Sequence, residues 1–334
     1  MKAKTVIERS ACKTRHTDTM KIPTEERKRM KSLTKIEKAR GLINHHKSIF
    51  KCPVCGGSVE VNRENSLVCG SGHSFDLSRK GYVNLLNSGR APAYSKDLFE
   101  ARRKVCEAGF YDPLIEKLTE ILAEYRGCGT KPGFAVLDAG CGEGSHLCGI
   151  FRRLGAIRPE AAGDFFVGID ISKDGILIAS RGDTGIIWCV SDLARLPFQD
   201  GSFDIVLNIL SPANYGEFGR VLKPRGLLVK VVPGERYLAE IREALASGGS
   251  AGSGIESYSN EQVIRYFKDK METAEIFDIR YRFRVEEQML PHLIKMTPLT
   301  WGKGADNLLS GKGISEITAE MTILTGRIKA AAPI

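Results

Sequence analysis

The stretch at residues 136–144, Val-Leu-Asp-Ala-Gly-Cys-Gly-Glu-Gly, begins as a strand-like segment and ends in three glycines at alternate positions. A helical pattern starts at Ser145. A strand that runs into a glycine turn and then a helix is typical of nucleotide-binding sites. Without side chains at Gly140, Gly142 and Gly144, the backbone can pass close under a ligand where any Cβ would collide. The stretch therefore predicts a cofactor-binding turn at the end of a strand.

Two acidic residues, Asp138 and Glu143, border this turn and narrow the choice of ligand. Phosphate-binding proteins share the glycine pattern, but a pyrophosphate would meet these carboxylates in a partly desolvated crevice. Each such like-charge contact costs about 1 kcal/mol or more. A cofactor with an ammonium and a sulfonium would be attracted instead, and S-adenosylmethionine carries both. We therefore predict S-adenosylmethionine as the cofactor.

Two further acids follow later predicted strands. Asp170 ends the apolar stretch 165–169, where a carboxylate can accept two hydrogen bonds from ribose hydroxyls. NAD-dependent proteins use the same device, so Asp170 indicates a nucleoside without specifying which one. Asp192 comes after the next predicted strand and could reach the adenine amino group, or it could simply cap a helix or a turn.

Strand-like and helix-like segments alternate from residue 134 onward, which favours an α/β fold with a mostly parallel sheet covered by helices on both faces. Segments 276–283 and 321–324 are predicted as antiparallel edge strands, and segment 97–125 as helical with a break at Asp112-Pro113. The predicted parallel strands are residues 134–137, 165–169, 186–190, 205–210 and 227–232. With the acid-flanked glycine turn, this series resembles the class I S-adenosylmethionine-dependent methyltransferases, a Rossmann-like fold, over residues 131–285.

Length and composition indicate a globular protein with about two folding units. The chain has 334 residues, of which 42% are apolar and 27% charged, which excludes collagen-like, coiled-coil and mostly disordered chains. The longest uncharged apolar runs have strand length and fall short of the ~20 residues that span a bilayer, so no membrane helix is predicted. The basic N-terminus lacks the apolar stretch of a secretory signal, so we expect a cytoplasmic protein.

The net charge of +9 is concentrated at the N-terminus. Residues 1–51 contain 15 Lys and Arg against 5 Asp and Glu, so the rest of the chain is close to neutral. Any RNA site there must come from local clustering of basic residues. Residues 1–48 are predicted as a basic extension, with a helix start at Pro23-Thr24 and apolar residues at near-helical spacing. It is either an amphipathic helix that docks on RNA or a solvated tail.

Three cysteines and a histidine are grouped between residues 52 and 73. Cys52, Cys55, Cys69 and His73 supply three thiolates and an imidazole, which suits one tetrahedral zinc ion. The glycines after Cys55 oppose a redox interpretation, which would place the cysteine pair at a helix start. Four protein ligands leave no position for a catalytic water, so the zinc is predicted to be structural. Its loops either contact a partner or are only held together by the metal.

Four segments follow the zinc motif along the chain, and they identify the chain as similar to a known family. These segments are Phe-Asp-Leu-Ser-Arg-Lys-Gly-Tyr-Val-Asn-Leu-Leu at 75–86, Ala-Arg-Arg at 101–103, Ala-Gly-Phe-Tyr-Asp-Pro-Leu at 108–114 and Met-Thr-Pro-Leu-Thr-Trp at 296–301. With the zinc motif and the methyltransferase core, they resemble the bacterial 23S rRNA guanine-N1-methyltransferases, including the tylosin-resistance type. The resemblance covers residues 50–330.

The resemblance implies roles for individual residues. It makes Cys52, Cys55, Cys69 and His73 the zinc ligands, and it implies a homodimer. It places Gly142, Glu143 and Asp170 on the cofactor, together with Tyr111 and Tyr237. Tyr237 falls where relatives often have histidine, and Tyr111 could also be an aromatic that packs helices. Composition and motifs along the chain divide it into the extension at 1–48, a zinc-binding module at 49–90, a helical bridge at 91–130 and a methyltransferase domain at 131–334.

Guanine N1 carries a proton in the neutral base, so the implied reaction needs a group that removes it. The sequence specifies no base. Asn214 could bond to the guanine edge and Glu217 could accept the proton, or both could belong to a loop turn. RNA contacts are expected at Arg79, Lys80, Arg102, Arg103 and Lys104. Two other functions remain: a small-molecule methyltransferase, which needs no zinc module, and a non-catalytic zinc protein that binds RNA, which needs no acid-flanked turn.

Overall fold

The computed structural model describes residues 33–86, 94–127, 133–157, 163–182, 185–248, 259–297, 300 and 313–329. Contacts within the chain separate Met1–Thr34 from a compact unit, Lys35–Ile334. The helix α2 (Lys35–His45) belongs to the compact unit because it buries Ala39 and Ile43. The boundary between the two units lies after Thr34, whereas the sequence placed the end of the basic extension at residue 48. The predicted helix start at Pro23 lies outside the described residues.

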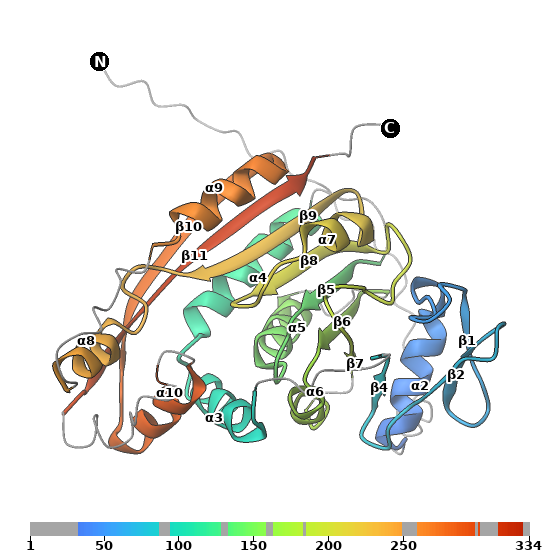
Figure 1. Cartoon of the computed structure of the whole chain (residues 1–334), viewed down its shortest axis with the longest axis horizontal. Coiled ribbons are helices and arrows are strands. Elements are labelled where there is room, and N and C mark those ends of the chain that lie inside the picture. Colours follow the sequence, from blue (N-terminus) through green and yellow to red (C-terminus); the bar gives the residue numbers. More distant parts are fainter. Residues whose placement is uncertain are drawn as a thin grey trace, which may run out of the picture. The chain divides into compact units, whose positions relative to one another are not determined.

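One eight-stranded sheet forms the centre of the described part of the unit (Figure 1). Its order is β10-β11-β9-β8-β5-β6-β7-β4, parallel from β9 to β4, while β11 is antiparallel to both β10 and β9. The strands are β4 (Tyr82–Asn84), β5 (Ala135–Ala139), β6 (Phe165–Asp170), β7 (Ile186–Val190), β8 (Phe203–Ile209), β9 (Leu222–Pro233), β10 (Met271–Arg284) and β11 (Glu316–Ile328). All five predicted parallel strands are confirmed.

Two features of the sheet differ from the prediction. The strand at 321–324 is not an edge strand, because β11 lies between β10 and β9 and is buried on both faces. The edge of the sheet opposite β10 is formed by β4, which comes from the predicted zinc-binding module and pairs with β7. Three residues are too few to stand out as a strand in the sequence.

Helices pack on both faces of the sheet and enclose two hydrophobic cores. Alternation along the strands produces this division, since Val136 joins one core while Ala135 and Leu137 join the other. The helices are α3 (Lys96–Glu107), α4 (Asp112–Gly127), α5 (Ser145–Ile157), α6 (Lys173–Ala179), α7 (Tyr215–Val221), α8 (Ala239–Gly248), α9 (Glu261–Lys270) and α10 (Leu290–Met296). The predicted break at Asp112-Pro113 is confirmed by the start of α4. No helix in the described ranges is long and apolar enough to cross a membrane.

A small antiparallel sheet, β1 (Val59–Val61), β2 (Ser66–Cys69) and β3 (Ser74–Asp76), shares its core with the large one. The Phe50 ring lies 5.4 Å from that of Phe198, and the Lys51 N–H donates to Pro197 O at 3.0 Å. Lys35 Nζ donates to the Ser180 and Arg181 carbonyls at the end of α6. The segment needs few apolar residues of its own because it uses the large core.

We predict that α2 is part of the cooperative fold. Ile43 is almost fully buried, so Ile43→Ala should lower the free energy of unfolding by about 2–4 kcal/mol in denaturant titration, because it leaves a cavity. The control Ile157→Ala removes an exposed side chain and should change the free energy of unfolding by less than about 0.5 kcal/mol. Equal effects of the two substitutions would contradict a packed α2.

Candidate functional site

A cavity of about 310 Å³ opens where β5, β6, β8 and β9 end. Ligands of open α/β sheets bind outside the carboxyl ends of the strands, where the strand order reverses, and β5 is the first strand on one side of that reversal. The walls include Phe99, Arg102, Tyr111, Gly140, Cys141, Glu143, His146, Asp170, Ile209, Leu210, Ser211, Pro212, Pro233, Gly234, Tyr237, Arg242, Met296 and Thr297. The cavity thus combines the glycine turn with residues from distant segments.

The glycine turn is required by the protein's own packing as well as by any ligand. Gly140, Gly142 and Gly144 all have positive φ, at 88°, 57° and 79°. A Cβ on Gly140 would lie 1.9 Å from Ser211 Oγ, and one on Gly144 would lie 2.6 Å from the Trp188 ring. Gly140 therefore sits against the loop after β8, and Gly144 against β7. Close approach of a ligand to the turn stays a prediction.

Three buried carboxyl groups surround the turn. Asp138 and Glu143 are only 1% and 2% exposed, and neither oxygen of Asp138 has a hydrogen-bond partner among the described residues. Burial, together with the charges of Asp170 and Glu143, raises the pKa of Asp138 to about 8. Burial also raises the pKa values of Glu143 and Asp170. A cation in the cavity would relieve this repulsion, whereas an anion would increase it.

Asp170 is held by the backbone at the end of β6. Its Oδ2 accepts a hydrogen bond from the Gly142 N–H at 2.9 Å, and its Oδ1 accepts one from the Ser172 N–H at 2.8 Å. Each carboxylate oxygen has a second lone pair, so both can still accept from a ligand. The carboxylate is therefore fixed at the cavity wall and connected directly to the turn.

Two tyrosines from distant segments meet at the cavity. The hydroxyl groups of Tyr111 and Tyr237 lie 2.6 Å apart, and burial raises the pKa of both. Tyr111 also packs edge-on against His146, with ring centroids 4.7 Å apart, so it has the packing role as well as a place in the cavity wall. His146 was not predicted. Its Nε2 is buried and has no hydrogen-bond partner within the described ranges, and burial with the charge of Arg102 lowers its pKa to about 3, so the ring is neutral.

The other predicted cofactor residues lie outside the cavity wall. Asp138 is buried beneath the turn, and Gly142 and Gly144 belong to the turn but do not line the cavity. Asp192 is exposed, and its Oδ1 accepts from the Ala194 N–H at 2.8 Å, as in a turn. Their cofactor contacts stay predictions, and for Asp192 the geometry favours the turn alternative.

The five basic residues expected on RNA do not form one cluster. Arg102 lines the cavity, half-buried, while Arg103 Nη1 donates to Ile178 O at 3.0 Å and so packs on α6. Lys104 is exposed, with Nζ 3.3 Å from His292 Nε2. Arg79 and Lys80 lie on the exposed turn before β4. The sequence spacing along α3 sends consecutive basic side chains in different directions.

Asn214 and Glu217 carry structural hydrogen bonds at the start of α7. Asn214 Oδ1 accepts from the Glu217 N–H at 3.2 Å, which caps the helix. Glu217 pairs with Arg220 at 2.7 Å and accepts from the Leu196 N–H. Neither residue lines the cavity. Their catalytic roles stay predictions, and the geometry favours the loop-turn alternative.

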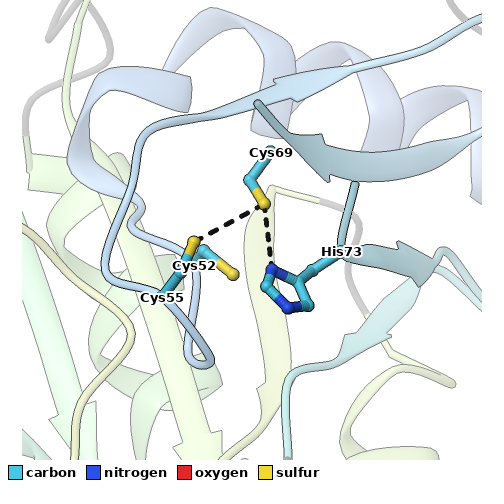
Figure 2. A group of neighbouring side chains, drawn as sticks. All are labelled: Cys52, Cys55, Cys69 and His73. Carbon is cyan, nitrogen blue, oxygen red and sulfur yellow. Dashed lines mark hydrogen bonds between the residues drawn. The ribbon is translucent and has the colours of Figure 1, made fainter. Parts of the chain in front are cut away.

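The four predicted metal ligands converge at the small sheet (Figure 2). Their ligand atoms all lie within 4.8 Å of one another. Cys55 Sγ lies 3.7 Å from Cys69 Sγ, and Cys69 Sγ lies 3.3 Å from His73 Nδ1. Zn–S bonds of about 2.3 Å in a tetrahedron place two sulfurs about 3.8 Å apart, so the cluster fits zinc. The Gly57 N–H, aided by Ser71, lowers the pKa of Cys55 to about 6, which favours the thiolate that a metal binds.

The fold and cavity define the class of this protein. A mostly parallel sheet with one inserted antiparallel strand, a glycine turn after β5 and an acid at the end of β6 are those of a class I S-adenosylmethionine-dependent methyltransferase. A family described as a methyltransferase domain matches residues 130–278. The zinc-ribbon family described as RlmA, N-terminal, matches residues 50–89.

Relatives that match most of this chain specify the family. The Bacillus subtilis (strain 168) protein YxjB, which bears the name of a 23S rRNA guanine-N1-methyltransferase, is 41% identical over 84% of this chain and 97% of its own. A 23S rRNA (guanine(748)-N(1))-methyltransferase from Streptomyces fradiae is 28% identical over 83% of this chain and 96% of its own. The chain therefore belongs to the 23S rRNA guanine-N1-methyltransferase family.

We predict that the metal is structural and remote from the cofactor. Cys69→Ser should release zinc and make residues 52–76 sensitive to protease, because a small module with few apolar residues depends on its metal. Binding of S-adenosylhomocysteine should change by less than about threefold. The control Cys12→Ser removes a thiol outside the cluster and should keep the metal. A Cys69→Ser protein that retains one zinc, or a protease-resistant module without it, would contradict this.

Proposed function

We propose that the protein transfers the methyl group of S-adenosylmethionine to N1 of one guanine in 23S rRNA. The observation that carries this proposal is the joint presence, in one compact unit, of a closed Cys/His cluster and an acid-lined methyltransferase cavity, matched across 97% of the length of a named relative. A small-molecule methyltransferase would need only the cavity. A non-catalytic RNA-binding protein would have no use for the buried acids.

The cofactor is proposed to lie across the glycine turn. Asp170 would accept hydrogen bonds from the ribose hydroxyls, and Glu143 would attract the ammonium and sulfonium charges. The paired hydroxyls of Tyr111 and Tyr237 would close the cavity around the cofactor. The support for this placement is the burial of Asp138 and Glu143 beside the cavity and the place of Asp170 in its wall.

Arg102 is proposed to bind the carboxylate of the cofactor's methionine group rather than RNA. Its guanidinium lies over the turn, because a Cβ on Gly142 would lie 3.3 Å from Nη1. Arg102 is close enough to Glu143 for their charges to interact, yet they form no ion pair within 4.0 Å among the described residues. A zwitterionic amino-acid group fits between a cation and an anion separated in this way.

The reaction itself is a displacement at carbon. The bond from guanine N1 to the methyl carbon forms while the carbon–sulfur bond breaks, and the N1 proton leaves the base. The cavity supplies alignment of the two atoms. N1 lies on the pairing edge, so the target guanine is unpaired or flipped when it enters.

RNA contacts are proposed for the exposed residues Arg79, Lys80 and Lys104 and for the loops of the Cys/His cluster. A ribosomal RNA substrate would place the reaction in the cytoplasm. The homodimer implied by the resemblance stays a prediction.

The product can be located on the RNA. N1 methylation removes the pairing edge, so reverse transcriptase should stop one nucleotide before the modified guanine after unmodified 23S rRNA is incubated with protein and S-adenosylmethionine. Asp170→Ala should abolish this stop and weaken cofactor binding at least tenfold, since two charge-assisted hydrogen bonds contribute roughly 2–4 kcal/mol. The control Asp174→Ala alters an exposed acid on α6 and should leave the stop in place. Label transfer to small molecules or protein alone would contradict the proposal.

The role of Arg102 can be tested with a cofactor that lacks the carboxylate. Arg102→Met should weaken S-adenosylmethionine about tenfold or more in calorimetric titration, because a charge-assisted bond is lost. Decarboxylated S-adenosylmethionine should bind the variant and the unmodified protein equally. The control Lys104→Met alters the same helix and should bind both cofactors normally. An equal loss of both cofactors in Arg102→Met would contradict carboxylate binding.

A further inference from the structure

A buried polar network joins the glycine turn to the loop that follows β8. Lys230, 6% exposed in the middle of β9, donates from Nζ to Asn208 Oδ1 at 2.7 Å and to Ser211 O at 3.1 Å. Asn208 is fully buried and donates from Nδ2 to the carbonyls of Ala139 at 2.8 Å and Pro212 at 2.9 Å. The network therefore connects β9, β8, the end of β5 and the loop.

The groups that it holds belong to, or lie next to, adjoining parts of the cavity wall. Ala139 immediately precedes Gly140 of the turn, and Ser211 and Pro212 line the cavity. The Ser211 side chain occupies the space that a Cβ on Gly140 would need. The spacing between the turn and the loop is thus set by two contacts, one through Asn208 and one through Ser211.

The backbone at the start of the loop is strained. Leu210 has φ of +50°, a conformation that residues with a Cβ rarely adopt. Its N–H donates to Val231 O at 3.1 Å, next to Lys230 in β9. Strained backbone persists only where its surroundings hold it in place, and it is frequent at functional sites.

A lysine buried at this position in the sheet lowers the stability of the fold. Its neighbours in β9 are apolar, and among the described residues its hydrogen bonds go to an amide and a carbonyl rather than to a carboxylate. Burial lowers the pKa of Lys230 to about 8. An unpaired buried cation destabilises a protein relative to an apolar side chain of similar size. Its presence therefore suggests a role other than stability.

We propose that Lys230 and Asn208 are positioning residues that hold the loop at residues 210–212 at a fixed distance from the glycine turn. This inference rests on the proposed methyl transfer to guanine. The turn would hold the cofactor, and the loop, which packs against the turn at Gly140, would line the path by which the target base enters. Because displacement requires the two reacting atoms to be aligned, a small shift of the loop slows the reaction without preventing binding.

The first test is Lys230→Met, which keeps the length of the side chain and removes the charge. The unfolding temperature should stay the same or rise, and the Kd for S-adenosylhomocysteine should change by less than about threefold. The kcat for rRNA methylation should fall at least about tenfold while KM changes by less than about threefold, as expected for lost alignment. Hydrogen exchange at residues 209–214 should become faster.

The matched control is Lys223→Met, at the other end of the same strand. Lys223 forms an ion pair with Asp204 at 2.7 Å, so its loss should affect stability slightly and leave kcat and exchange of the loop unchanged. Asn208→Asp serves as a second variant. It keeps the acceptor for Lys230 but loses the donors to Ala139 and Pro212, so it should also speed exchange of the loop and lower kcat.

The outcomes separate this inference from the function on which it rests. If the protein without substitutions binds the cofactor but methylates no guanine, that result would contradict the proposed function. Active protein in which Lys230→Met and Asn208→Asp both keep kcat within about twofold, or both leave exchange at residues 209–214 unchanged, would contradict the positioning role. If Lys230→Met fails to fold, Asn208→Asp decides the same question.

Discussion

The repulsion among three buried carboxyl groups is the constraint on which the cavity depends. Asp138, Glu143 and Asp170 gather around one glycine turn because parallel strands β5 and β6 end at the same edge of the sheet. Burial favours their neutral forms, and the charges of Glu143 and Asp170 raise the pKa of Asp138 further. A ligand with two positive charges stabilises this arrangement, whereas a pyrophosphate destabilises it. The shared glycine turn of nucleotide-binding folds is thereby restricted to a cationic cofactor.

The Cys/His module is a part of the methyltransferase fold rather than a separate finger. It contributes β4 to the edge of the large sheet and packs α2 against α6 and β7. Its own apolar residues are too few for an independent core, and two of the four metal ligands, Cys52 and Cys69, are buried in the shared core. The loops that would contact RNA thus belong to the same compact unit as the cavity. This favours a fixed distance between the site that recognises RNA and the site of methyl transfer.

Local pattern predicted the strands and the metal ligands but not the contacts between distant segments. The apolar runs at 134–137 and 227–232 were readable because strands buried on both faces are apolar almost throughout, with Lys230 as the exception in the second run. The boundary near Thr34, the strand β4 and the interior place of β11 depend on pairing that no local pattern encodes. The sequence showed Arg102 as one of three consecutive basic residues, whereas the direction of each side chain depends on helix packing. Nothing in the sequence around Lys230 indicates its partners, because Asn208 comes beside it only through the pairing of β8 with β9.

Proton release on cofactor binding tests the central claim most directly. Asp138 has a pKa of about 8, so near that pH it is partly protonated in the free protein. The sulfonium of S-adenosylmethionine favours the ionised carboxylate and lowers this pKa, so binding should release protons. Calorimetric titration at pH 8 in two buffers of different ionisation enthalpy measures that release. The account predicts clear release with S-adenosylmethionine and less with S-adenosylhomocysteine, which lacks the sulfonium charge. Equal release with both ligands, or none with either, would contradict a cavity built around buried carboxylates.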